Sequence, residues 1–237
     1  MPTTLEPLAD MPLILAYHSV SDARTDGLAV RPEAFDWQMR WLAEHGYRAA
    51  TLSQWAVGAA SRGERAVWIT FDDGYADNAA VAFPILQRYG FTATVFLVAS
   101  AVGSGAVFWW DRAKLAGGTD PGPFAPLDWA QVEQLAAAGF EFGSHTLTHP
   151  AALTALPAEA CWEEIAGSRA ALTARLGTAV ASFCYPRGDL NAAVVRMVAA
   201  AGYACAVVTP PRPDIPHTRY TLRRVSLYRE YGPALFR

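Results

Sequence analysis

Two short polar segments of this chain carry residue types that suit a hydrolytic metal site. Asp72 and Asp73 end one apolar run of strand length, and His145 and His149 follow another. Strand ends that break into loops are where a scaffold presents reactive groups to solvent. One carboxylate can hold a cation while its neighbour takes a proton, and a spacing of four lets both imidazoles face one point in a helical turn or a curled loop. An Asp-His-His set leaves coordination positions open, as catalytic metal sites do.

Each motif alone has a plainer interpretation. Asp-Asp-Gly at 72–74 is common in turns and helix caps, because Asp and Gly are ordinary turn residues. A single His-x-x-x-His pair is weak support for a metal. Two of the chain's five histidines fall at ligand spacing, and each motif directly follows an apolar run. The two motifs together therefore favour the functional interpretation.

Three segments carry a family resemblance. Residues 70–74 (Thr-Phe-Asp-Asp-Gly) resemble the first motif of the polysaccharide deacetylases, the NodB-homology group also called carbohydrate esterase family 4. Residues 144–150 (Ser-His-Thr-Leu-Thr-His-Pro) resemble the second motif. Residues 183–188 (Phe-Cys-Tyr-Pro-Arg-Gly) resemble the third, which closes one side of the substrate groove. The order and spacing also fit, and the similarity runs from about residue 12 to about residue 225.

The resemblance implies metal-dependent removal of acetyl groups from N-acetylated sugars or glycoconjugates, with release of acetate. It assigns Asp72 as the general base. It assigns Asp73, His145 and His149 as the ligands of one divalent ion, usually Zn²⁺, with Co²⁺, Ni²⁺ and Fe²⁺ left open.

The catalytic acid departs from the common form of the family, which places a histidine on a late strand. The late histidine of this chain, His217, lies in a proline-broken polar stretch that is typical of a loop. His18 instead follows the apolar run 13–17, which resembles the branch that deacetylates poly-N-acetylglucosamine. In that branch an early Tyr-His strand takes the place of the missing late one in a circularly permuted barrel. His18 is therefore the candidate acid, against the plainer interpretation of a hydrogen-bonded strand end, and His217 is the next candidate.

The expected reaction follows from these residue types. An N-acetyl group is an unactivated amide, and a bound divalent ion lowers the pKa of its water and polarises the carbonyl oxygen. Asp72 would take the proton of the water. The backbone N–H of Tyr75 would help to stabilise the oxyanion, and His18 would protonate the leaving amine.

Substrate contacts are predicted at the loops beside these motifs. The predicted substrate-binding residues are Tyr75, Trp109, Trp110, Tyr185, Pro186 and Arg187. Paired tryptophans on the predicted active face either stack on a sugar ring or belong to the core. Arg187 stands where many relatives have an aromatic residue, and it is expected to bind a phosphate or carboxylate of the substrate or to pair with a carboxylate such as Asp189.

Apolar runs of strand length alternate with helix-periodic segments along the chain. Strands are predicted near 13–17, 66–71, 92–98, 139–144, 181–185, 203–208 and 222–226, and helices near 32–44, 53–60, 78–89 with a kink at Pro84, 128–138, 157–176 and 192–201. Alternation of this kind demands a parallel sheet covered by helices. Seven to eight parallel strands in a single domain, residues 1–237, predict a distorted α/β barrel, whose C-terminal strand ends form the active face.

Composition limits the partners of the chain. Its content of 52% hydrophobic and 17% charged residues is typical of a globular protein. Its net charge of −3 does not favour binding to nucleic acid, and no stable membrane insertion is expected. The arginines near the C-terminal end are interpreted as a solvated face: Arg219, Arg223, Arg224, Arg229 and Arg237. Three scattered cysteines predict neither a disulfide framework nor a thiolate zinc site.

Location and substrate identity are less constrained. No Lys or Arg precedes Arg24, and the apolar run near Leu13 is too short for a signal or a membrane span. The chain is therefore expected in the cytoplasm, acting on an intracellular N-acetyl sugar. An amidohydrolase of the same fold acting on an imide or ring amide stays open, as does a non-catalytic carbohydrate-binding relative. The oligomeric state, the sugar and its linkage are left open.

Overall fold

The computed structural model describes residue 8, residues 12–59, 65–115, 118–210 and 214–231, and residue 236. Its strands are β1 (Ile14–Tyr17), β2 (Ser19–Val20), β3 (Ala29–Val30), β4 (Arg48–Ala49), β5 (Ala66–Phe71), β6 (Thr94–Leu97), β7 (Glu141–Ser144), β8 (Ser182–Cys184), β9 (Cys205–Val208), β10 (Leu222–Arg223) and β11 (Val225–Ser226). Its α-helices are α1 (Pro32–Glu44), α2 (Leu52–Ala56), α3 (Phe83–Arg88), α4 (Trp129–Ala137), α5 (Ala158–Trp162), α6 (Ser168–Leu176) and α7 (Ala192–Ala200). Two π-helical segments span Asn78–Ala82 and Glu163–Gly167, and short 3₁₀ turns span Arg112–Leu115, Gly122–Phe124, Leu153–Ala155 and Pro186–Gly188.

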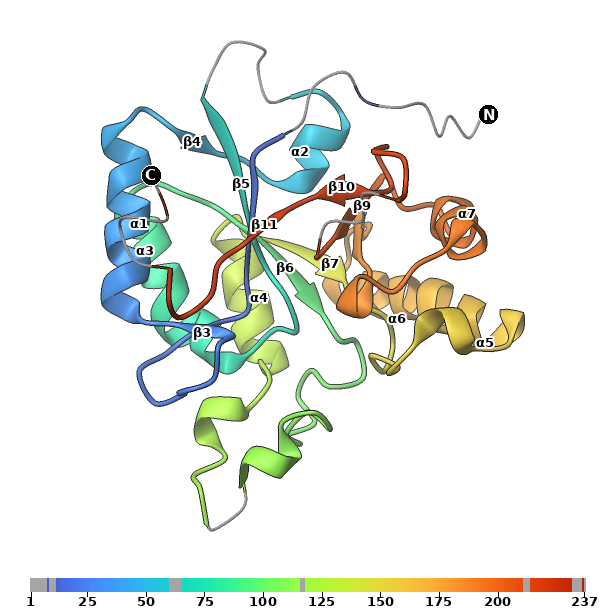
Figure 1. Cartoon of the computed structure of the whole chain (residues 1–237), viewed down its shortest axis with the longest axis horizontal. Coiled ribbons are helices and arrows are strands. Elements are labelled where there is room, and N and C mark those ends of the chain that lie inside the picture. The colour runs from blue at the N-terminus through green and yellow to red at the C-terminus, as the bar shows by residue number, and fades with distance from the viewer. Residues whose placement is uncertain are drawn as a thin grey trace.

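One parallel sheet organises the described residues. Its strand order is β10-β9-β8-β7-β6-β5-β1-β11, with β4 paired beside β5. The helices lie around the outside of this sheet, with α1 and α3 on one flank and α5, α6 and α7 on the other (Figure 1). The small pair β2 and β3 stands apart from the main sheet.

A single C-terminal segment forms both ends of the sheet. Leu222 and Arg223 of β10 pair with β9, and after one residue the chain continues as β11, which pairs with β1. The segment therefore changes its partner strand at Arg224 and nearly closes the sheet, as its path across the middle of Figure 1 shows. The predicted distorted (β/α) barrel is confirmed.

Alternation along β5 divides the core into two parts. Val67, Ile69 and Phe71 belong to the large cluster that includes residues of the surrounding helices, whereas Trp68 packs in a second cluster with Phe96 and other strand residues. Successive strand side chains point to opposite faces, so the second cluster is the barrel interior. Burial of each such aliphatic or aromatic side chain contributes roughly 1.5–3 kcal/mol.

The helices follow local signals in the sequence. Helix α1 begins with Pro32 at its first position, where the missing N–H costs no hydrogen bond. Asp128 and Gln131 form the predicted capping box at the start of α4. The predicted kink at Pro84 takes the form of a π-helical segment directly before α3, because proline cannot donate to the preceding turn. A second π-helical segment divides the predicted helix 157–176 into α5 and α6.

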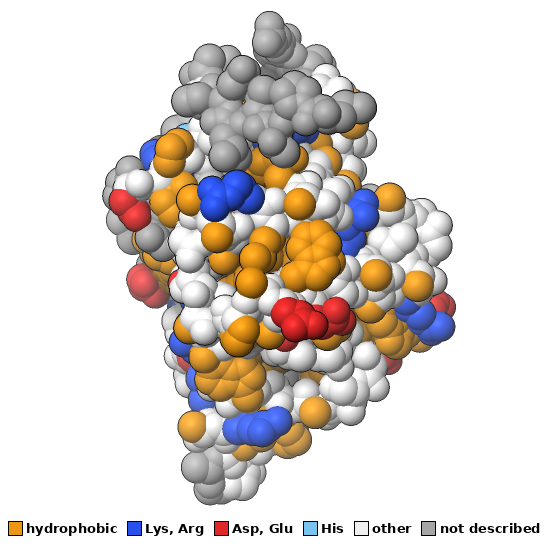
Figure 2. All heavy atoms as spheres, turned by 90° about the vertical axis from the view of Figure 1, so that its right-hand side faces the viewer, with side chains coloured by type: hydrophobic (Ala, Val, Ile, Leu, Met, Phe, Trp, Pro, Cys, Tyr) orange, Lys and Arg blue, Asp and Glu red, His pale blue; other side chains and the backbone are white. Residues whose placement is uncertain are grey.

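The face that carries α5, α6 and α7 is turned to the viewer in Figure 2. Apolar and charged side chains are mixed over the described part of this face, without an extended patch of one charge sign there. In the part of the chain that the structure describes, no helix is long and apolar enough to cross a membrane.

Candidate active site

The two acidic and histidine motifs meet at the C-terminal ends of β5 and β7. Asp72 directly follows β5 and its backbone N–H donates to the carbonyl of Tyr17 at 2.9 Å, which ties it to the end of β1. His145 directly follows β7 and its N–H donates to the carbonyl of Leu97 at 2.8 Å, at the end of β6. Neighbouring parallel strands thus bring the two motifs to one rim.

The segment between the two histidines is a curled loop and not a helical turn. Thr146 and His149 have φ values of 68° and 56°, in the left-handed region. The N–H of His149 donates to Thr146 Oγ1 at 3.0 Å, and the N–H groups of Leu147 and Thr148 donate to Glu164 Oε2 at 2.9 Å. Of the two geometries that the spacing allows, the structure adopts the loop.

Left-handed backbone is concentrated at this rim. Four described residues other than glycine have positive φ: Asp73 at 70°, Thr146 at 68°, His149 at 56° and Arg187 at 56°. Such conformations cost about 1–3 kcal/mol each and persist only where the surroundings fix them. Strain of this kind gathers at functional sites, and here Asp73, His149 and Arg187 line one cavity while Thr146 directly follows its lining residue His145.

Asp73, His145 and His149 form a buried group of metal-ligand type. Asp73 Oδ1 lies 3.5 Å from His145 Nε2 and 3.8 Å from His149 Nε2, and the three ligand atoms lie within 4.8 Å of one another. His145 Nδ1 lies 2.8 Å from the carbonyl oxygen of Cys184, so this nitrogen carries the proton and Nε2 presents a lone pair. Burial lowers the pKa values of both histidines, which favours the neutral form that coordinates metals.

The charge of Asp73 also suits a cation. Burial raises the pKa of Asp73 well above its ordinary value, and the carboxylates of Asp72 and Asp111 raise it further. The ionised form of Asp73 is therefore costly here, and a cation among the three ligand atoms would stabilise it. The donor set, one carboxylate and two imidazoles, fits a divalent ion of the zinc type with coordination positions left over.

A second group, Asp72, His145 and Cys184, has metal-ligand spacing but does not suit a cation. Arg224 Nη2 donates to Asp72 Oδ2 at 2.6 Å and lies 3.1 Å from Cys184 Sγ, so a guanidinium already neutralises this corner. Burial raises the pKa of the Cys184 thiol, which keeps it protonated.

Arg224 holds Asp72 in a fixed, ionised state. Nη1 and Nη2 donate to the two carboxylate oxygens at 2.7 and 2.6 Å, Nη1 also donates to Thr70 Oγ1 at 2.9 Å, and Nε donates to Thr209 Oγ1 at 2.8 Å. Burial works to raise the pKa of Asp72, but the ion pair and hydrogen bonds with Arg224 hold it well below its usual range. Asp72 is therefore a carboxylate at neutral pH, oriented by its partner.

Arg224 also corrects the interpretation of the C-terminal arginines as a solvated face. Arg224 is 3% exposed, Arg219 donates to the carbonyls of Ala204 and Ala56, and Arg229 donates to the carbonyl of Arg24 at 2.7 Å. These arginines donate to backbone carbonyls or to the Asp72 carboxylate and are not a freely solvated face. Arg237 lies outside the described residues.

His18 lies directly after β1 and faces the same cavity. Its Nε2 is 3.9 Å from Asp72 Oδ2, and its Nδ1 has no hydrogen-bond partner among the described residues. Burial lowers the pKa of His18 to about 4. Asn78 Nδ2 donates to the backbone carbonyl of His18 at 2.9 Å, which fixes its main chain. His217, the next candidate for the acid, hydrogen-bonds through Nδ1 to the carbonyl oxygen of Thr221 and does not line this cavity.

The cavity between these residues has a volume of about 330 Å³. It is lined by His18, Leu28, Asp72, Asp73, Trp110, His145, His149, Tyr185, Arg187, Thr209, Pro210 and Tyr228. Three of the six predicted substrate-binding residues, Trp110, Tyr185 and Arg187, are part of its wall. Leu28, Thr209, Pro210 and Tyr228 were not predicted, because they come from loops with no motif of their own.

The tryptophan pair stands beside the candidate metal ligands. The Trp110 ring packs 4.2 Å from the His149 ring, centroid to centroid, and its Nε1 donates to the hydroxyl of Tyr75 at 3.1 Å. Trp109 is 41% exposed, and its Nε1 donates to the carbonyl of His149 at 3.1 Å. Trp109 and Pro186 lie outside the residues that line the cavity.

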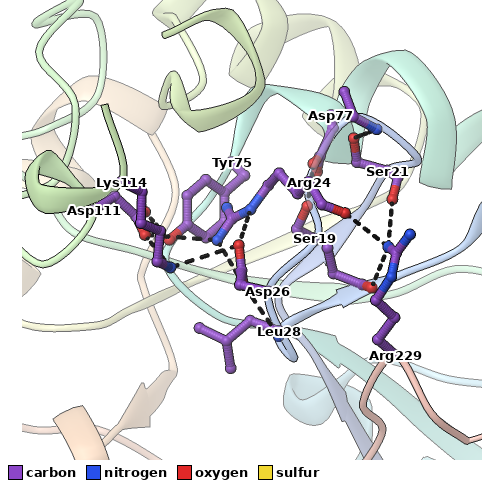
Figure 3. Close-up of polar contacts among 12 residues, drawn as sticks. Ser19, Ser21, Arg24, Asp26, Leu28, Tyr75, Asp77, Asp111, Lys114 and Arg229 are labelled. Carbon is purple, nitrogen blue, oxygen red and sulfur yellow. Dashed lines mark hydrogen bonds and ion pairs between the residues drawn. The ribbon is translucent and has the colours of Figure 1, made fainter. Parts of the chain in front are cut away.

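Tyr75 does not line the cavity, and its side chain belongs to a largely buried polar network (Figure 3). Its hydroxyl donates to Asp111 Oδ2 at 2.6 Å, and Lys114 Nζ donates to Asp111 Oδ1 at 2.7 Å. The Arg24 guanidinium lies 4.2 Å from the Tyr75 ring centroid and donates to Asp26 at 3.0 and 3.2 Å. The network joins the loop that carries Leu28 to the loop that carries Trp110. Sequence reasoning missed it, because Arg24 lies in a polar stretch that matches no motif.

The backbone N–H of Tyr75 is not used by its neighbouring strand contact. Tyr75 pairs with Pro126 in an antiparallel bridge, whose hydrogen bonds are made by the flanking residues. The N–H of Leu127 donates to the carbonyl of Gly74, and the N–H of Ala76 donates to the carbonyl of Ala125. The N–H of Tyr75 itself makes no hydrogen bond within the described residues.

The fold and the site place the chain in the class of distorted parallel (β/α) barrels with a charged rim at the C-terminal strand ends. A family model described as polysaccharide deacetylase matches residues 59–206, and the chain belongs to this family.

Relatives and solved structures agree with this assignment. The Bacillus subtilis protein YxkH is 29% identical over 201 residues, covering 84% of this chain and 64% of its own length. The poly-beta-1,6-N-acetyl-D-glucosamine N-deacetylase of Escherichia coli is 34% identical over 142 residues, covering 56% of this chain and 20% of its own length. The chain thus spans less than two thirds of either relative.

Two solved structures share the fold. The Streptococcus pyogenes deacetylase PplD, solved in complex with acetate, superposes with a TM-score of 0.77 at 22% identity, covering 97% of both chains. IcaB from Ammonifex degensii gives a TM-score of 0.76 at 23% identity, covering 96% of this chain and 94% of its own.

Proposed function

We propose that this protein is a metal-dependent hydrolase that removes the acetyl group from an N-acetylated sugar or glycoconjugate and releases acetate. The observation that carries the proposal is the meeting of three buried ligand atoms, an ionised carboxylate and a histidine in one cavity. Family membership and the relative that acts on poly-beta-1,6-N-acetyl-D-glucosamine support the choice of substrate class.

Asp73, His145 and His149 are the proposed ligands of a single divalent ion, with Zn²⁺ the first candidate. When bound, such an ion lowers the pKa of a coordinated water and polarises the substrate carbonyl. The Cys184 carbonyl, which fixes the tautomer of His145, and the Trp110 ring, which packs on His149, orient the two imidazoles.

Asp72 is the proposed general base. It is ionised, its two oxygens are fixed by Arg224, and it borders the cavity beside Asp73. A carboxylate in this state accepts the proton of the attacking water. The free N–H of Tyr75 is the proposed donor to the developing oxyanion, because a preorganised backbone donor costs no reorganisation during the reaction.

His18 is the proposed acid. It is neutral at rest, and its Nε2 lies 3.9 Å from Asp72 Oδ2, so a small rotation brings the two groups into hydrogen-bonding distance. The proton that Asp72 removes from water can then pass to His18 and on to the leaving amine. This route supplies the acid without requiring a protonated histidine in the resting site.

Metal content and acetate release test the proposal together. Zinc-loaded protein is expected to hold one ion per chain by elemental mass spectrometry and to release acetate from N-acetyl sugars. His149→Ala should lose the ion, whereas the control His45→Ala, at an exposed histidine stacked on Trp41, should keep it. A full complement of zinc in His149→Ala, or hydrolysis of cyclic imides in place of N-acetyl sugars, would contradict the proposal.

A further inference from the structure

One basic side chain in the described part of the cavity wall takes no part in the proposed reaction. Among the described residues that line the cavity, Arg187 is the only arginine or lysine. Its side chain is exposed, and its guanidinium lies over the ring of Trp109 at 5.1 Å from the centroid. Within the described residues it makes no hydrogen bond and no ion pair, so its N–H groups face solvent at the cavity wall.

The carboxylate nearest in sequence is already bound elsewhere. Asp189 accepts hydrogen bonds from the backbone N–H of Thr154 at 2.9 Å and from Thr154 Oγ1 at 2.9 and 3.0 Å. The predicted alternative of an Arg187–Asp189 pair is therefore not realised. Among the described residues no carboxylate pairs with the Arg187 guanidinium, which contacts only the ring of Trp109 there.

The backbone holds Arg187 in place. Its φ of 56° is left-handed, and the next residue, Gly188, has a φ of 65°. A Cβ on Gly188 would lie 2.6 Å from the carbonyl oxygen of Thr209, a residue that itself lines the cavity. The turn thus packs directly against the cavity wall, and a strained conformation that the surroundings fix indicates a functional position.

We infer that Arg187 binds an anionic group, a phosphate or a carboxylate, that the substrate carries beside its N-acetyl sugar ring. The inference rests on the proposed function and names its substrate class. A guanidinium binds either oxyanion through two parallel N–H···O bonds, and the Trp109 ring beneath it covers one face while leaving the N–H edge free.

The same charge disfavours a polymer of neutral N-acetyl sugars. Each deacetylation of such a polymer leaves an ammonium group, and these groups accumulate along the chain. Like charges repel at the short distances of a binding cavity, so Arg187 would weaken the binding of partly deacetylated segments. A small anionic glycoside or sugar phosphate gains from the same residue.

Acetate release from matched substrates tests the inference on the zinc-loaded full chain. N-acetylglucosamine 6-phosphate supplies a phosphate, N-acetylmuramic acid a carboxylate, and N-acetylglucosamine is the neutral reference. Arg187→Gln should lower kcat/KM for the preferred anionic substrate by about 10- to 100-fold, mainly through KM, and change the neutral reference by no more than about twofold. Arg187→Lys should fall between, because it keeps charge but not the planar fork. Arg196→Gln, at an exposed arginine of α7, should change neither rate.

The outcomes separate the inference from the proposed function. A preference for one anionic substrate identifies phosphate or carboxylate as the group bound. Equal kcat/KM for anionic and neutral sugars in the wild type overturns the inference, and so does an equal loss on both in Arg187→Gln. If no N-acetyl sugar is hydrolysed, the proposed function fails. In that case calorimetry compares the binding of glucosamine 6-phosphate with that of glucosamine. If Arg187→Gln does not weaken the binding of glucosamine 6-phosphate, the anion site is overturned as well.

Discussion

Replacement of Arg224 by methionine tests the ion pair that fixes Asp72. The guanidinium donates to both carboxylate oxygens at 2.7 and 2.6 Å, and Asp72 and Arg224 are each 3% exposed. Removal of one partner of a buried pair leaves an uncompensated charge, which typically costs about 3–5 kcal/mol. In a domain of this size each 1 kcal/mol lowers Tm by roughly 2–4 °C, so Arg224→Met should lower Tm by about 6–20 °C at pH 7.

The pH dependence of this effect has a defined sign. Burial works to raise the pKa of Asp72, but Arg224 holds it below its usual range, so the pair stabilises the fold above the unfolded-state pKa of about 3.9. That contribution disappears as the pH falls through the lower folded-state value. In Arg224→Met the largest opposing interaction is gone, so we expect burial to raise the pKa of Asp72 above its unfolded value. The loss of unfolding free energy in Arg224→Met, relative to the wild type, should therefore be largest at neutral pH and shrink as the pH approaches 4.

Urea unfolding of chelator-treated protein, followed by circular dichroism at pH 7 and pH 4.5, measures both effects. The double variant Asp72→Asn/Arg224→Met removes the stranded charge and should be more stable than Arg224→Met alone. Arg223→Met is the matched control, since Arg223 donates one 3.3 Å bond to the carbonyl of Ile215, and it should cost less than about 1 kcal/mol. An Arg224→Met protein within about 1 kcal/mol of the wild type at pH 7, or a double variant no more stable than the single one, would refute the reasoning.

Two further variants test the assigned roles in catalysis. Asp72→Asn should keep its metal and lose most turnover, because an amide does not accept the proton of water at neutral pH; equal loss of metal and activity would make Asp72 a ligand. His18→Ala should slow hydrolysis of an N-acetyl sugar by roughly 10²–10⁴-fold with the metal retained, and slow an activated ester much less, because that leaving group needs no proton. If both substrates slow equally, the acid is another group.

The architecture and the central motif residues were predictable from local pattern. Asp72, Asp73, His145 and His149 directly follow apolar runs, and a parallel barrel gathers the C-terminal ends of its strands at one rim. The sequence therefore placed these residues together without any knowledge of distances. The capping box at Asp128 and the bounds of α1 followed from equally local rules.

Features that depend on distant partners were not predictable. Arginine is usually a surface residue. Arg224 is buried because the closing segment changes its partner strand at this position, which directs the guanidinium toward Asp72. Tyr75 follows the acidic motif, yet its side chain turns into the network of Asp111. Loop residues such as Leu28 and Tyr228 reach the cavity through tertiary packing that no periodicity reports.

The partner change at Arg224 has a consequence for the order in which the protein folds. Leu15 pairs with Val225, so the contact that completes the barrel joins residues from the two ends of the described chain. Contacts of such long sequence separation form late, because the entropy of closing the intervening loop must first be lost. The strand β11 has two residues and a half-exposed Val225, so the buried Arg224–Asp72 pair beside it carries much of the attachment of this segment. In Arg224→Met, mild denaturant should therefore release the segment first, and activity should disappear while most helices remain folded.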